Sequence, residues 1–144
     1  MAAANSFIVD WDAKFHYNRW RPVTAVRNGD LDGNDATERD AGWTPLNATP
    51  MHPEYPSQAA IFAGVSAGVY DAVFGPGMAA RIVVTDSADP KITRQFESIA
   101  AVTEETRLVR VWGGIHFRNT LEVSDAMGRE VAAYLAANSI RPVR

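Results

Sequence analysis

Apolar residues recur at helical spacing in four stretches of the chain, separated by polar residues and prolines. The stretches cover residues 6–20, 57–75, 90–110 and 120–137. Side chains three or four positions apart lie on one face of a helix, so each stretch can bury an apolar face against the others. The pattern therefore predicts a mainly helical fold with four principal helices.

Prolines and glycines indicate where these helices begin and end. Pro22 disfavours helical backbone at the residue before it, so the first helix should stop there. Ser57 follows a proline, and residues 75–77 read Gly-Pro-Gly, which is typical of a helix start and stop. We expect Pro90 in the first turn of the third helix and Gly113-Gly114 beyond its end.

Three segments between the helices have a different character. Residues 28–40 are rich in Asp, Asn and Gly, which predicts a surface loop. Residues 44–56 contain four prolines and should run extended and rigid. Residues 82–85 are rich in β-branched side chains and form either a strand or an extended connection.

The surface loop of residues 28–40, called the acidic loop below, has part of the spacing of a calcium-binding loop. Asp30, Asp32 and Asn34 alternate as calcium ligands would. However, the sixth position is Asp35 instead of glycine, and the twelfth is Ala41 instead of glutamate. The pattern therefore argues against a calcium site.

Length and composition describe one domain, residues 1–144, with a modest core. The chain has 144 residues, of which 47% are hydrophobic. A chain this small leaves apolar helix faces uncovered, so we expect a homo-oligomer. The net charge of −3 and the scattered Lys and Arg residues argue against a nucleic-acid surface. The absence of cysteine excludes disulfides and thiolate metal sites.

No targeting or membrane segment is visible. The first residues lack the basic and apolar regions of a secretory signal. The most apolar segment, residues 59–75, is interrupted by Ser66 and Asp71 and is short for a bilayer span of about 20 residues. We expect a cytoplasmic protein without a membrane span.

The chemistry of the chain centres on Arg110 and His116, which are separated by Gly113-Gly114. On an unbroken helix, residues six apart point roughly 240° from one another. The two glycines allow the helix to end after Arg110 and the chain to turn back, so both side chains can face one ligand. An arginine suits a tetrahedral oxyanion, and a histidine nitrogen can be a nucleophile, a metal ligand or a proton carrier.

Further anion-binding groups occur elsewhere in the chain. Lys14 and Arg21 are seven residues apart and share one face if the first helix reaches Arg21. A solvated basic face is the alternative. Ser57 stands at a helix start, where free N–H groups and the helix dipole favour an anion, although an ordinary capping serine would look the same.

Three motifs together resemble one family. Lys14-x6-Arg21-Pro22, Pro56-Ser57 and Arg110-x5-His116 resemble the signature of the vanadium-dependent haloperoxidases and type 2 phosphatidic acid phosphatases, written Lys-x6-Arg-Pro, Pro-Ser-Gly-His and Ser-Arg-x5-His-x3-Asp. The residues around them look like the soluble, haloperoxidase-related branch. The resemblance implies an all-α helical bundle, here a shortened version or the C-terminal part of a longer family architecture.

The resemblance also implies a role for each motif residue. His116 would be the axial group, bonding to vanadium in a haloperoxidase or attacking phosphorus in a phosphatase. The other groups would hold the oxygens of the cofactor, vanadate or phosphate: Lys14, Arg21, Arg110, Ser57 and the backbone amide of Gln58. The reactants would be peroxide and halide, or a phosphate ester.

The chain departs from the family pattern at four positions. Gln58 and Ala59 replace Gly-His, so the general acid or base histidine is absent, and His52 or His16 would have to transfer protons. Val109 replaces the serine before the arginine. Thr120 stands where the orienting aspartate belongs, so the tautomer of His116 needs another partner, such as a backbone carbonyl.

Three classes of function remain open on this basis. The chain is a haloperoxidase-like or phosphatase-like enzyme, an oxyanion-binding module without turnover, or a structural helical association domain. Ala59 favours the binding module, and the intact set of cations argues against the structural domain.

Overall fold

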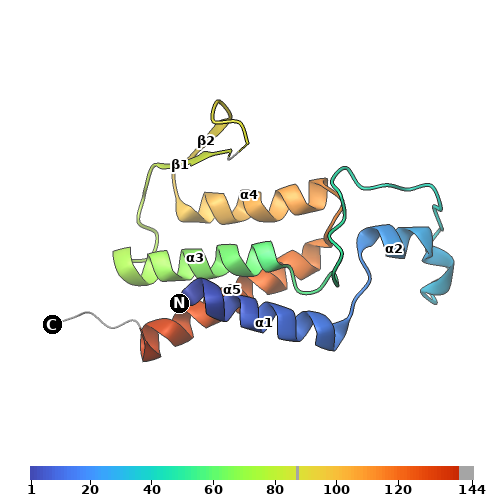
Figure 1. The fold of residues 1–144 in the computed structure, drawn as a ribbon, viewed down its shortest axis with the longest axis horizontal. Helices are drawn as coiled ribbons and strands as arrows, with labels where there is room; N and C mark the ends of the chain where they lie inside the picture. Colours follow the sequence, from blue (N-terminus) through green and yellow to red (C-terminus); the bar gives the residue numbers. More distant parts are fainter. Residues whose placement is uncertain (87, 140–144) are drawn as a thin grey trace.

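The computed structural model describes residues 1–86 and 88–139, and this part of the chain contains four long helices that form a bundle (Figure 1). They are α1 (Ala2–Tyr17), α3 (Gln58–Phe74), α4 (Ile99–Trp112) and α5 (Arg118–Asn138). The central helix is α3, which packs most extensively on α5 and also contacts α1 and α4. The predicted helical bundle with four principal helices is confirmed.

The contact between α3 and α5 depends on glycines at two points of close approach. A Cβ atom at Gly64 would lie 2.2 Å from the carbonyl oxygen of Asp125, and one at Gly128 would lie 2.2 Å from that of Ile61. Only glycine leaves room for the opposite backbone at such a distance. The helices therefore meet backbone to backbone, and the buried side chains around them are mostly small: Ala60, Ile61, Val65, Ala67, Leu121 and Ala132.

The first helix is shorter at its C-terminal end than the sequence predicted. It ends at Tyr17, because Asn18 takes a left-handed conformation with φ 44°, which asparagine tolerates better than most residues. The chain then runs extended to Arg21, and Pro22 begins a second short helix, α2 (Pro22–Arg27). The first helix does not reach Arg21, so the condition for Lys14 and Arg21 to share one helix face is not met.

A β-hairpin replaces the first part of the expected third helix. Strands β1 (Ile82–Thr85) and β2 (Thr93–Phe96) pair antiparallel, with Ile82 opposite Phe96. The Asp86 carboxylate accepts hydrogen bonds from the backbone N–H groups of Ala88 and Asp89, which forms a turn where a helix start was expected. Helix α4 begins after Ser98, whose side chain caps it by accepting a hydrogen bond from Ala101 N.

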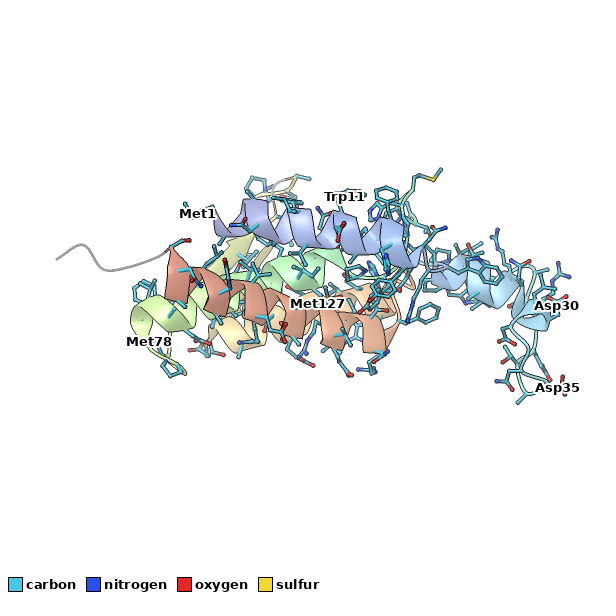
Figure 2. The ribbon with its side chains drawn as sticks, turned by 90° about the horizontal axis from the view of Figure 1, so that it is seen from below. Met1, Trp11, Asp30, Asp35, Met78 and Met127 are labelled. Carbon is cyan, nitrogen blue, oxygen red and sulfur yellow. The ribbon has the colours of Figure 1, made fainter. Side chains whose placement is uncertain are left out.

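The remaining sequence predictions concern loops and exposure. Residues 44–56 form neither helix nor strand, as predicted. The acidic loop includes a short 3₁₀ helix, η1 (Gly29–Leu31), and Asp30 and Asp35 lie at the end of the molecule away from the bundle (Figure 2). In α5, Leu121 and Leu135 are buried, whereas Tyr134 is 67% exposed.

Large apolar side chains remain exposed on α1. Ile8 is 68% exposed and Phe15 is 67% exposed. Exposed apolar groups on one helix face favour association. Self-association of this chain stays a prediction.

Candidate functional site

The three motifs lie at one end of the bundle. Figure 1 shows that α1 and α4 end where α3 and α5 begin, with the proline-rich segment 44–56 passing between them. The turn after α4 contains Gly114 at φ 70°, a backbone conformation that favours glycine. Helix α4 ends at Trp112, two residues beyond the expected position, and the glycine turn places His116 directly before α5.

Arg21 joins segments that lie far apart in the sequence. Its side chain is buried, and Nη1 donates to the carbonyl oxygen of Ile115 at 2.9 Å and contacts His116 Nε2 at 3.0 Å. On its other side, Nε donates to the carbonyl oxygen of His52 at 3.0 Å, and Nη2 lies 3.2 Å from His52 Nδ1. The guanidinium thus connects both histidines that the sequence indicated as catalytic.

His116 is held by a carboxylate that sequence reasoning missed. Its Nδ1 lies 2.8 Å from Oε1 of Glu54, which is fully buried. Glu54 also accepts hydrogen bonds from Phe117 N at 3.1 Å and from Thr120 Oγ1 at 2.8 Å. The expected backbone carbonyl is therefore not the partner of His116. The only sequence signal was an acidic residue within the proline-rich segment that leads to Ser57.

The protonation states of this pair follow from burial and hydrogen bonding. Burial raises the pKa of Glu54, but the hydrogen bonds from His116, Phe117 and Thr120 outweigh it and hold that pKa below its usual value. Burial, and after it the charge of Arg21, lower the pKa of His116, although Glu54 opposes them. His116 is accordingly a neutral imidazole with its proton on Nδ1 and a lone pair on Nε2.

Lys14 is fully buried beneath the same segment. Its ammonium donates to the carbonyl oxygens of Pro53, at 3.0 Å, and of Pro56, and it lies 3.7 Å from Asp10 Oδ1. Burial lowers the pKa of Lys14 to about 8 and raises that of Asp10 to about 6. Lys14 is therefore next to the start of α3, and two of its three N–H groups already have protein acceptors.

Two of the predicted ligands have buried polar atoms without a partner. Within the described part of the chain, neither Ser57 Oγ nor Arg110 Nε makes a hydrogen bond. Ser57 does not cap α3 with its side chain, although its N–H group donates to Ser124 Oγ on α5 at 2.8 Å. An unsatisfied buried polar atom costs about 1–3 kcal/mol, so two such atoms among five predicted anion ligands are informative.

A cavity of about 520 Å³ is lined by Arg110 and by Gln58, the residue that follows Ser57. Gln58, Ala59 and Arg110 contribute to its wall, together with apolar residues that include Phe62 and Val102. The side chain at position 59 therefore faces the same space as Arg110. The structure thus links Lys14, Arg21, His52 and His116 through shared contacts around the segment that ends at Ser57, and it places Arg110 on the cavity wall with Gln58 and Ala59.

Other sequence-based alternatives receive no support from the geometry. His16 is exposed, and its ring packs against Tyr17. Among the described residues, no group of three His, Cys, Asp or Glu side chains is arranged to hold a metal ion. The described helices include none with both the length and the apolar character needed to cross a membrane.

Comparison with known proteins gives consistent matches. A family model described as the VCPO second helical-bundle domain matches residues 1–143. The crystal structure of the first bacterial vanadium-dependent iodoperoxidase is similar with a TM-score of 0.79 and 30% identity, over 97% of this chain and 32% of that chain.

Two further crystal structures, both of bacterial vanadium-dependent chloroperoxidases, show the same fold. The holo-type structure matches with a TM-score of 0.72 and 23% identity, over 94% of this chain and 33% of its own. The apo-type structure matches with a TM-score of 0.69 and 20% identity, over 96% of this chain and 36% of its own. The chain thus spans about a third of the length of these proteins. No curated protein matches it.

Proposed function

The chain belongs to the family of VCPO second helical-bundle domains within the vanadium haloperoxidase superfamily, and we propose that it binds vanadate at the site around His116. Phosphate, which has the same tetrahedral shape and negative charge, would bind in its place. Residues 1–144 are proposed to act as one helical domain, in which this site serves a haloperoxidase reaction.

The observation that carries this proposal is the pair of unpartnered polar atoms. Ser57 Oγ and Arg110 Nε are buried without hydrogen-bond acceptors or donors among the described residues. Both belong to motifs whose family counterparts hold an oxyanion. An anion whose oxygens reached both groups would satisfy them at once. The two unpartnered atoms therefore support vanadate as the ligand.

Each remaining group has a role that follows from its chemistry. His116 Nε2, which carries the lone pair, is the atom that would ligate vanadium. Arg21 and Lys14, with Arg110, would neutralise the oxygens of the anion. The free N–H groups at the start of α3, including that of Gln58, would donate to the same oxygens. When bound, vanadate supplies the chemistry by which hydrogen peroxide oxidises a halide.

Proton transfer in this site is assigned to His52. Position 59 carries a methyl group that cannot titrate, whereas His52 Nδ1 lies 3.2 Å from Arg21. His52 Nδ1 also lies 3.3 Å from the carbonyl oxygen of Pro53. If Nδ1 donates to that oxygen, the lone pair of the neutral ring is on Nε2, which can then accept a proton. Burial lowers the pKa of His52, and the charges of Lys14 and Arg21 lower it further. A neutral imidazole is a base available at neutral pH.

A second candidate function is anion binding without turnover. Ala59 favours it, because positioned proton transfer typically contributes about 10² to 10⁴ in rate. The same site would then retain vanadate or phosphate but oxidise halide slowly.

The proposal is tested by titrating the purified protein with vanadate while following binding by ⁵¹V NMR, with phosphate as competitor. We expect saturable binding at one site, loss of binding in His116→Ala, and no change in His16→Ala, which removes an exposed histidine of the same chemistry. Equal binding by wild type and His116→Ala would contradict the proposal. A halide and peroxide assay then separates the two candidate functions. His52→Ala should lower the rate of halide oxidation if the protein is an enzyme, and should change nothing if it only binds the anion.

A further inference from the structure

The carboxylate that holds His116 comes from an unexpected part of the chain. In the family motif, an aspartate follows the histidine by four residues, and here that position is Thr120. We propose that Glu54 is the positioning residue of this site, fixing His116 with its lone pair on Nε2, and that Thr120 orients Glu54. This inference rests on the proposed function, because the position of the lone pair matters only if Nε2 ligates the oxyanion.

The geometry leaves Glu54 little freedom. One carboxylate oxygen accepts from His116 Nδ1 at 2.8 Å and from Phe117 N at 3.1 Å, and the other accepts from Thr120 Oγ1 at 2.8 Å. Glu54 is 0% exposed and Thr120 is 2% exposed, so water does not compete for these bonds. The backbone N–H of Glu54 donates to the carbonyl oxygen of Arg19 at 3.0 Å, which anchors the segment as well.

The chemical consequence concerns a single proton. An ionised carboxylate only accepts hydrogen bonds, so the nitrogen that faces Glu54 must carry the proton of the neutral ring. Nδ1 faces Glu54, and Nε2 faces Arg21 and is left with the lone pair. An amide in place of the carboxylate could present either an oxygen or an N–H₂ group, and the preference for one tautomer would weaken. Carboxylates of this kind also raise the basicity of a ligating histidine.

Glu54 also explains why threonine suits position 120. An aspartate there would place a second carboxylate against the first, where both are buried, and like charges in such a site repel strongly. A threonine hydroxyl instead donates a hydrogen bond to Oε2. Compared with the family motif, the carboxylate is therefore on the proline-rich segment instead of at the start of α5, and here it lies on Nδ1 of His116.

This difference in position makes a charge-exchange experiment possible. Glu54→Gln keeps the size and removes the charge, Thr120→Asp adds a second carboxylate, and the double variant returns the single carboxylate to position 120. Glu122→Gln, an exposed glutamate on the same helix as Thr120, is the matched control. The first measurement is the ring ¹⁵N spectrum of His116 without vanadate, assigned by its absence in His116→Ala. The second is vanadate affinity.

We expect wild type to show the Nδ1-protonated tautomer and Glu54→Gln to show a mixture, with vanadate binding about 10- to 100-fold weaker. Thr120→Asp alone should also weaken binding. The double variant should regain the tautomer and most of the affinity, and the control should behave as wild type. Retention of the wild-type tautomer in Glu54→Gln would overturn the inference, as would a double variant that regains neither property.

A variant that fails to fold does not end the test. Thr120→Val keeps the carboxylate and removes only the hydroxyl donor, so it should retain the tautomer but bind vanadate several-fold more weakly, in the direction expected for lost outer hydrogen bonds. Unchanged affinity in Thr120→Val would contradict the role given to Thr120. If wild type shows the expected tautomer but binds no vanadate, the proposed function is refuted. That outcome differs from a failure of the positioning role of Glu54, in which the expected tautomer itself is missing.

Discussion

Replacing Gly64 by alanine should destabilise the protein, although alanine is the better helix former. The added Cβ would lie 2.2 Å from the carbonyl oxygen of Asp125, 3.0 Å from its carbonyl carbon and 3.2 Å from its Cα. All three atoms are backbone, so no side-chain rotation can relieve the contact. The two helices would have to separate by about 1 Å, a gap that already forfeits a quarter to a half of the attraction between facing atoms.

The net effect is the difference between two contributions. Overpacking of this kind typically costs about 1–3 kcal/mol and occasionally more, and a backbone obstacle belongs at the upper end. The change from glycine to alanine inside a helix returns about 1 kcal/mol. We therefore expect the free energy of unfolding to fall by about 2 kcal/mol, from a total that is typically about 5–15 kcal/mol. Urea unfolding followed by circular dichroism should show a lower midpoint with an unchanged slope.

A second glycine on the same helix supplies the control. A Cβ at Gly68 would lie 2.5 Å from the Cβ of Ala132, which is a side-chain atom that can be removed. The exchange variant Gly68→Ala with Ala132→Gly moves one methyl group across the interface and leaves the helix propensities balanced, so its stability should stay within about 1 kcal/mol of wild type. A Gly64→Ala protein as stable as this exchange variant would refute the argument from backbone contact.

Three further predictions concern the site and its support. Ser124→Ala should lower the free energy of unfolding by about 1–3 kcal/mol in urea, because the buried N–H of Ser57 loses its acceptor. Asp10→Asn should change the pH dependence of stability: the folded-state pKa of Asp10 is raised to about 6 from 3.8, so its contribution is present below pH 3.8 and is lost as pH rises to about 6. Wild type measured by thermal unfolding should therefore lose stability relative to Asp10→Asn across that window, and a constant difference would count against the burial that raises the pKa of Asp10. Finally, Gln58→Gly with Ala59→His should raise halide oxidation by up to about 10²-fold in a peroxide assay, with no gain when His116→Ala is added, because position 59 faces the cavity beside Arg110.

Short-range patterns were sufficient to predict several parts of the site. The two glycines after α4 predicted a turn that returns the chain toward Arg110, and Gly114 does take a positive φ. Proline followed by Ser57 predicted the start of α3 to within one residue. These features depend on the backbone preferences of single residues, which the sequence states directly.

Interactions and conformations that the sequence patterns did not indicate explain the errors. Pro90 looked like a helix start, but residues 93–96 pair with a strand eleven positions earlier, and such pairing overrides a local signal. The left-handed Asn18 turns the chain so that Arg21 reaches the site from outside α1. Glu54 was missed because its partners lie 62 to 66 residues away, so no spacing pattern connects them.

The contact between Arg21 and His116 bears on which anions the site can distinguish. The guanidinium donates toward the lone pair of Nε2 at 3.0 Å, so under the proposed function a bound anion would have to offer that nitrogen a better partner. Vanadium has a vacant coordination position that can accept the lone pair, whereas the sulfur of sulfate does not. Sulfate could therefore replace the ionic contacts alone and would leave Arg21 in place. If the proposed site binds vanadate, discrimination between two tetrahedral anions of similar size would come from the competing contact with Arg21, in addition to the shape and charge of the site.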